Sequence, residues 1–139
     1  MARFCKKPLL VTARAFKPIK RVLIAFDDGK STRNAVQNVA LNPLFHGLDI
    51  KLITVGDQSD KVESALMQAA HALGEAGLTV STDTVPGQPE TTINQEIESG
   101  GHDLLVMGAH GHSRIRRMIL GSTTTSLMAS CKISVLLYR

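Results

Sequence analysis

The chain has 139 residues, which is the size of one ordinary domain and is long enough to bury a hydrophobic core. Its 43% hydrophobic and 20% charged residues exclude a disordered chain, and no apolar run approaches the roughly 20 residues of a membrane span. A net charge of +4 suggests nucleic-acid binding, but much of the excess lies in residues 3–21 and only 4% of residues are aromatic, so we discount nucleic acid as a partner.

The cellular compartment is suggested by two further features. Cys5 and Cys131 make neither a disulfide framework nor a zinc site, so a reducing environment is the default. The apolar patch PLLVTA stops at Arg14 and is too short for a convincing signal peptide. We therefore expect a soluble cytoplasmic protein that is not bound to a membrane.

The first strong pattern along the chain is strand, helix, strand. Residues 21–26 (RVLIAF) form a continuous apolar run that is typical of a strand buried on both faces. Apolar residues at helical spacing predict a helix over residues 31–41, which Pro43 stops. Residues 49–55 (DIKLITV) predict a second strand.

The pattern then repeats. Apolar residues at steps of three and four predict a helix over residues 59–76. Asp60 followed by Glu63 suggests a capping box at its start, and Gly77 suits a left-handed stop. Residues 78–85 alternate in polarity and predict a third strand.

The last third of the chain continues the alternation. Pro89 sits where a first-turn proline is tolerated, ahead of a short apolar stripe that predicts a helix. Residues 103–108 (DLLVMG) predict a fourth buried strand, a helix is expected over about 118–130, and residues 133–138 (ISVLLY) predict the fifth strand.

Strands alternating with helices predict an α/β three-layer sandwich: a parallel sheet with right-handed crossovers and helices on both faces. Ligands of such sheets bind beyond the carboxyl ends of the strands, where the strand order reverses. The loops that follow residues 26, 55 and 107 are therefore the ones to search for a site.

The two ends of the chain are similar to each other. Residues 5–14 (CKKPLLVTAR) and 131–139 (CKISVLLYR) both read as Cys-Lys, a short gap, an apolar run and an arginine. We interpret the first copy as an extra strand with no domain in front of it. A coincidental basic and apolar tail is the alternative, because short apolar runs are common.

The fragment DDGKST at residues 27–32 contains half of a phosphate-loop motif. That motif requires glycine, four residues, and then Gly-Lys-Ser/Thr. Counting back from Gly29 places its first position at Ile24, inside the strand. We interpret the fragment as a turn followed by a helix cap, with Ser31 or Thr32 as the cap residue.

The segment after the fourth predicted strand is the stronger candidate for phosphate. Gly108 and Gly111 allow the backbone to approach a ligand without a Cβ in the way. Gly121 and Ser122 fall near the first turn of the next predicted helix, where unpaired N–H groups and the helix dipole favour an anion. Glycines that merely permit a turn are the alternative interpretation. Further donors in this segment are His110, His112, Arg114 and Thr123.

The stretch GAHGHSRIRRMILGST resembles the Gly-x2-Gly-x9-Gly-Ser/Thr signature of the universal stress protein family, with matches at Gly108, Gly111, Gly121 and Ser122. VLIAFDDGKSTRNAV, DLLVMGAHG and SVLLYR are also similar to that family, so the resemblance covers about residues 20–139. It implies a five-stranded parallel sheet of order 3-2-1-4-5, the adenine-nucleotide alpha-hydrolase-like fold. It also implies ATP bound at the switch point between the first and fourth strands.

The resemblance further implies a set of binding residues. Asp27, at the end of the first strand, would face the ribose hydroxyls, and Val55, at the end of the second, would contact adenine. A turn-forming aspartate is the alternative for Asp27. The implied nucleotide-binding residues are Ala25, Phe26, Asp27, Val55, Met107, Gly108, His110, Gly111, His112, Arg114, Gly121, Ser122 and Thr123.

The sequence departs from the family pattern in two places. The usual Asp-Gly-Ser turn reads Asp27-Asp28-Gly29, which adds negative charge near the implied site. Either aspartate could hold Mg²⁺ through water, but the same carboxylates fit equally with no metal. The usual proline of the last strand is Ser134, whereas Pro8 keeps it in the N-terminal copy.

The family includes tandem proteins with two such domains in one chain. We therefore interpret residues 1–19 as the last strand and linker of a preceding domain, and residues 20–139 as the universal stress protein domain. In the family, fifth strands pair across a dimer or between tandem halves. We expect residues 8–13 to pair antiparallel with residues 133–138, within the chain or with a neighbour, and we expect a homodimer through the last strand.

The implied function is an ATP-binding sensor or regulatory module of the stress response. A hydrolase needs a positioned base and usually a set of metal ligands, whereas this segment offers histidines, arginines and hydroxyls. We assign no catalytic residues and expect at most slow ATP hydrolysis. His110 and His112 lack the further ligands of a zinc site. The alternatives are a module of the same fold that dimerises or binds proteins without nucleotide, and an adenylating enzyme, which would need its own phosphate loop.

Overall fold

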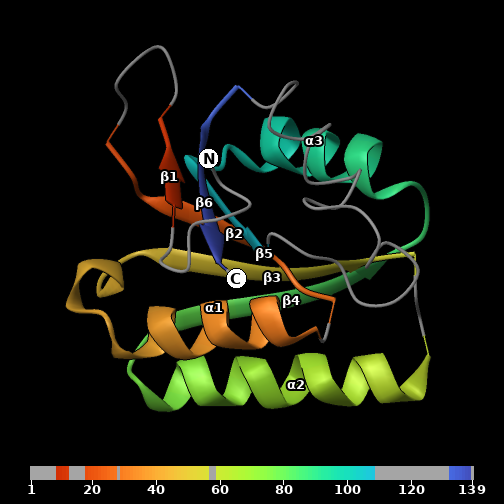
Figure 1. Ribbon diagram of the computed structural model, residues 1–139, viewed down its shortest axis with the longest axis horizontal. Coiled ribbons are helices and arrows are strands. Elements are labelled where there is room, and N and C mark those ends of the chain that lie inside the picture. The colour runs from red at the N-terminus through yellow and green to blue at the C-terminus, as the bar shows by residue number, and fades with distance from the viewer. Residues whose placement is uncertain (1–8, 13–17, 28, 57–58, 109–131, 139) are drawn as a thin grey trace.

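The structure is a computed structural model that describes residues 9–12, 18–27, 29–56, 59–108 and 132–138. In this part of the chain, one six-stranded sheet carries α1 and α2 on one face and α3 on the other (Figure 1). No helix among these residues is long and apolar enough to cross a membrane.

The sheet has the order β1-β6-β5-β2-β3-β4, and every neighbouring pair is parallel except β1 with β6. When β2 to β6 are counted in chain order, this is the expected parallel order 3-2-1-4-5, so the predicted fold class is confirmed. Because β2 lies between β3 and β5, the strand order reverses at β2. The strands are β1 (Leu9–Val11), β2 (Arg21–Ala25), β3 (Asp49–Val55), β4 (Thr79–Val85), β5 (Leu104–Gly108) and β6 (Ser134–Tyr138).

The starts of two helices correct the sequence expectations. The N-cap of α1 is Gly29, and the expected cap residues Ser31 and Thr32 are instead buried inside the first turn. The N-cap of α2 is Ser59, whose hydroxyl accepts the N–H of Val62, so the expected capping box is wrong and Asp60 is the first helical residue. The helices are α1 (Lys30–Leu41), α2 (Asp60–Glu75), α3 (Pro89–Gly100) and the short 3-10 helix η1 (Pro43–Phe45).

The proline and glycine expected at helix ends lie where the sequence predicts them. Pro89 is in the first turn of α3, where its missing N–H costs no helical hydrogen bond. Gly77 follows α2 with a φ of +89°, a conformation that glycine adopts without strain. The helix expected over 118–130 lies outside the described residues.

The hydrophobic core has two parts, one on each face of the sheet. Side chains alternate along the central strand β2, so Val22 and Ile24 pack under α1 and α2, while Leu23 packs under α3. All three are 0% exposed. A parallel strand covered on both faces needs apolar residues at every position, which explains the continuous run in the sequence.

The extra N-terminal strand lies in the same sheet. β1 pairs antiparallel with β6 through Leu9 and Leu137, Leu10 and Leu136, and Val11 and Val135. Figure 1 shows the two strands side by side at one edge of the sheet. The expected antiparallel pairing is therefore confirmed for these residues, and it occurs within the chain.

Candidate nucleotide site at the carboxyl ends of the strands

The described site residues lie together at the carboxyl ends of the parallel strands. Ala25 ends β2, Val55 ends β3, and Gly108 ends β5. β2 is hydrogen-bonded to both β3 and β5, so these ends lie next to one another at the switch point of the sheet. Asp28 and seven of the expected site residues lie outside the described residues: His110, Gly111, His112, Arg114, Gly121, Ser122 and Thr123.

Two of the expected residues turn their side chains into the core. Phe26 is 4% exposed and packs in the core under α1 and α2. Met107 is 5% exposed and packs in the core under α3. Val55 and Ala25 are half-buried at the margin of that second core. Phe26 and Met107 can therefore contact a ligand at this site only through their main-chain atoms.

The carboxylate of Asp27 is held by the chain that follows it. Its Oδ1 accepts the backbone N–H of Gly29 at 2.8 Å and the hydroxyl of Thr32 at 2.8 Å. Thr32 is 2% exposed, so the donor of this second bond is buried, while the bond as a whole is partly buried. The structure thus gives Asp27 the turn-forming role that the sequence left open. The same two bonds fix the orientation of its carboxylate at the carboxyl end of β2.

A second threonine fastens the end of β2, and the sequence analysis did not identify it. The Thr54 hydroxyl donates to the carbonyl of Phe26 at 3.0 Å, and the Phe26 N–H donates to the carbonyl of Ile53 at 2.8 Å. Thr54 is 2% exposed. The sequence could have indicated this role, because Thr54 lies within an apolar strand and a buried hydroxyl requires a hydrogen-bond partner.

Gly108 is in contact with the first turn of α1. A Cβ added at this residue would lie 2.6 Å from the Cβ of Ser31, and 3.3 Å from both the Cγ2 and the backbone N of Thr32. Real Cβ atoms do not approach another carbon to 2.6 Å. The close packing of β5 on α1 therefore requires glycine at this position.

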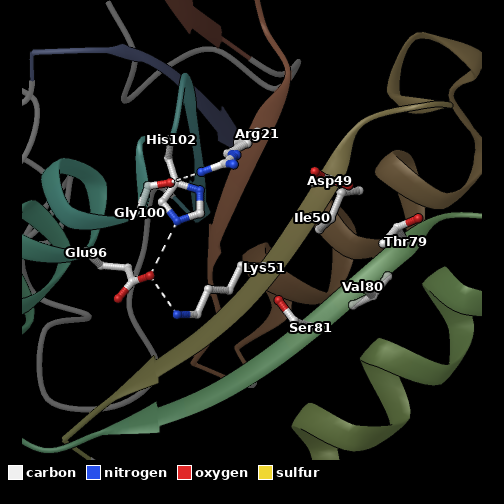
Figure 2. A pocket seen from close by; sticks show the side chains of 10 residues that line it. All are labelled: Arg21, Asp49, Ile50, Lys51, Thr79, Val80, Ser81, Glu96, Gly100 and His102. Carbon is white, nitrogen blue, oxygen red and sulfur yellow. Dashed lines mark hydrogen bonds and ion pairs between the residues drawn. The ribbon is translucent and has the colours of Figure 1, made fainter.

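A separate pocket of about 420 Å³ lies at the opposite end of β3 (Figure 2). Lys51 and His102 both reach Glu96 there: Nζ of Lys51 lies 2.6 Å from Oε1 of Glu96, and Nε2 of His102 lies 3.4 Å from it. Burial raises the pKa of Glu96, but hydrogen bonds to Lys51 and His102, together with electrostatic attraction to these side chains, outweigh burial and hold this pKa below its ordinary value.

Most charged groups of this pocket are bonded to other protein groups, while Nδ1 of the buried His102 has no hydrogen-bond partner among the described residues. Lys51 also lies 3.7 Å from a carboxylate oxygen of Asp83, and Nη1 of Arg21 donates to the carbonyl of Gly100 at 2.8 Å. Within the described residues, no group of three or more His, Cys, Asp or Glu side chains is placed to hold a metal. The network is best described as a cross-link between β3 and α3. The sequence did not reveal it because Lys51 and Glu96 are 45 residues apart.

Comparison with known proteins identifies the family of this chain. The model of the Universal stress protein family matches residues 51–139. Universal stress protein Slr1230 from Synechocystis sp. (strain ATCC 27184 / PCC 6803 / Kazusa) is 37% identical over 139 residues, which cover 99% of this chain and 48% of that protein. The chain thus spans about half the length of this relative.

Solved structures agree at the level of the fold. A universal stress protein from Archaeoglobus fulgidus DSM 4304 has a TM-score of 0.77 at 22% identity, over 99% of this chain and 51% of that chain. A universal stress protein in complex with cAMP has a TM-score of 0.71 at 22% identity, over 88% of this chain and 98% of that chain. The family model matches more than half of the residues of this chain, and the chain therefore belongs to the universal stress protein family.

Proposed function

We propose that this chain binds ATP where β2, β3 and β5 end, and that the bound nucleotide makes it a sensor or regulatory module of the stress response. The observation that carries the proposal is the fixed Asp27 carboxylate at the point where the strand order reverses. A universal stress protein of similar fold has been solved in complex with cAMP, which supports an adenine nucleotide as the ligand class.

In this proposal the described residues hold the nucleoside. The Asp27 carboxylate accepts hydrogen bonds from the ribose hydroxyls, because an ionised carboxylate is a strong acceptor. The half-buried side chain of Val55 contacts the adenine ring. Main-chain atoms of Ala25, Phe26, Met107 and Gly108 border the nucleoside.

The phosphates fall to the glycine-rich segment that follows β5. Main-chain N–H groups at Gly111, Gly121 and Ser122 bind phosphate oxygens in the proposal, since backbone amides at a helix start favour anions. His110, His112, Arg114 and Thr123 are the additional donors. Mg²⁺ would accompany the phosphates through water held by Asp27 or Asp28. We assign no catalytic base, so any ATP hydrolysis is expected to be slow.

Two measurements test the proposal. The protein is purified without added nucleotide and denatured, and the released nucleotide is identified by chromatography. The affinity for ATP is then measured by calorimetry for the parent and for Asp27→Asn, which keeps the shape of the side chain but removes its charge. We expect the ATP dissociation constant to rise by about tenfold, which corresponds to the loss of one charged hydrogen bond.

A matched control sits at the other end of the same sheet. Asp49 begins β3 and is exposed, so Asp49→Asn makes the same chemical change far from the proposed site and should leave ATP affinity unchanged. Gly111→Val should abolish binding if backbone approaches the phosphates there. A parent protein that releases no nucleotide and does not bind millimolar ATP would refute the proposal, and would favour a module of this fold that acts through dimerisation or protein partners alone.

A further inference from the structure

The glycine that ends β5 is required for a reason other than backbone conformation. Gly108 is absent from the described glycines that have a positive φ, so a side chain is not excluded by the local backbone. What excludes it is space, because a Cβ at this position would lie 2.6 Å from the Cβ of Ser31. Ser31 is itself 5% exposed and sits in the first turn of α1, so it has little room to move away.

The turn that packs on Gly108 is also the turn that holds Asp27. Thr32 donates its hydroxyl to Oδ1 of Asp27 at 2.8 Å, and the same hydroxyl lies 3.1 Å from the carbonyl oxygen of Gly29. The other side of Thr32 faces β5, since its Cγ2 would be 3.3 Å from a Cβ at Gly108. A displacement of the first turn of α1 away from β5 would therefore also displace the hydroxyl that orients the Asp27 carboxylate.

We propose that Gly108 and Thr32 are positioning residues for Asp27. The bare Cα of Gly108 lets the first turn of α1 approach β5, and Thr32 in that turn fixes the carboxylate toward the space where β2, β3 and β5 end. The effect on ligand binding rests on the proposed function, in which Asp27 binds the ribose. The packing between Gly108 and α1 does not rest on it.

A mutant cycle tests the role of Gly108 by compensation. Gly108→Ala adds the Cβ, Ser31→Gly removes the carbon that it meets, and Ser31→Ala keeps that carbon while removing the hydroxyl. The melting temperature and the ATP dissociation constant are measured for the three single variants and for Gly108→Ala combined with each change at Ser31. A pair in contact gives non-additive effects, whereas independent positions give additive ones.

We expect Gly108→Ala to lower the melting temperature by roughly 5 °C or more and to weaken ATP binding by about tenfold. Adding Ser31→Gly should restore both quantities to within about threefold in affinity and about 2 °C of the Ser31→Gly single variant. Adding Ser31→Ala should restore neither, because the clashing carbon remains. If Gly108 only contacted the ligand, Ser31→Gly would not restore the ATP affinity of Gly108→Ala. Restoration by Ser31→Gly but not by Ser31→Ala therefore distinguishes the positioning role from direct ligand contact.

The hydroxyl of Thr32 is tested by a conservative pair. Thr32→Val removes the donor to Asp27 and should weaken ATP binding by about tenfold, while Thr32→Ser keeps the hydroxyl and should bind within about threefold of the parent. If Thr32→Val binds ATP as the parent does, Thr32 does not orient Asp27 and the inference is wrong.

Other outcomes separate the inference from the proposed function. If the Ser31→Gly change restores the melting temperature of Gly108→Ala but not its ATP affinity, the glycine serves the ligand directly and the positioning role falls. A Gly108→Ala variant with the parent's stability and affinity would also overturn it. If the parent binds no ATP, the proposed function fails, and the ligand half of the inference fails with it. The melting-temperature cycle then still decides whether Gly108 makes room for Ser31.

Discussion

The end of β2 shows how single hydroxyl groups shape the candidate site. Phe26, the residue before Asp27, is bonded at both its N–H and its carbonyl, and the carbonyl's partner is the buried hydroxyl of Thr54. This arrangement fixes the peptide that leads into the Asp27 turn. A buried carbonyl that loses such a donor keeps its desolvation cost, so the position is sensitive to small changes.

Thr54→Val should therefore lower the free energy of unfolding by about 1–2 kcal/mol, because it removes the hydroxyl with little change in shape. Urea unfolding measures this loss. The matched control is Thr82→Val on β4. Among the described residues its hydroxyl contacts only the sulfur of Met67, at 4.0 Å, so the expected change is below about 0.5 kcal/mol. Equal losses in the two variants would show that the bond to Phe26 contributes nothing specific.

At the residue scale the sequence predicted positions better than partners. Asp27 and Val55 were expected at the carboxyl edge of the sheet, and the structure places them there. Ser31 or Thr32 was expected to cap α1, but Gly29 occupies that position, and Thr32 binds Asp27 instead. The turn between strand and helix is in close contact with Gly108 of β5, and a contact between residues so far apart in the sequence is not visible in local propensity.

At the scale of elements, the bond between Lys51 and Glu96 ties β3 to α3. The apolar stripe of α3 predicted a helix, and Ile93 and Ile97 of this stripe pack in the second core, but the stripe did not predict this polar cross-link. Which residue pairs with Lys51 depends on how far α3 extends over the sheet. Glu96, one turn before the end of the helix, meets that requirement.

The cross-link should make stability depend on pH. The pKa of Glu96 is lower in the folded chain than its ordinary value of 4.5, so its contribution is fully present above about pH 4.5 and is lost as the pH falls through the folded pKa. Urea unfolding of the parent and of Glu96→Gln between pH 7 and pH 3 should therefore show a stability difference that shrinks in the acid range.

Two further variants check this assignment. Lys51→Met removes the principal partner of Glu96, so in that background the stability difference caused by Glu96→Gln should depend less on pH. Glu98 is exposed on α3, and its carboxylate lies 3.7 Å from Nζ of Lys132 in solvent, so Glu98→Gln should have little effect at any pH. A difference between the parent and Glu96→Gln that stays constant down to pH 3 would contradict the lowered pKa.

At the scale of the whole molecule, β1 protects one edge of the sheet. Val11 is half-buried against the core under α3, whereas its neighbour Leu10 is 52% exposed. The parallel pairing of β2 to β6 could be predicted from the alternation of strands and helices, and their order was implied by the resemblance to the family. The pairing of β1 within the chain could not, because the same backbone hydrogen bonds form equally well with a neighbouring molecule.

Val11→Asp should release β1 and expose the edge of β6, because a charge at that position must leave water. An open edge strand pairs with other chains, so we expect concentration-dependent association in analytical ultracentrifugation and faster amide exchange at residues 135–137. Leu10→Asp places the same charge on the exposed side of the strand and should change neither. Association of both variants, or of neither, would show that β1 does not guard this edge.

The pairing of Leu9 with Leu137 has one more consequence for the path of the backbone. Cross-strand partners lie only about 5 Å apart, so the described chain returns almost to its starting point and traces a nearly closed circuit. In a circular permutant, a short linker would join the chain where Leu9 meets Leu137, and the chain would be opened at the exposed Gly47 turn. We expect this permutant to bury the same two hydrophobic cores.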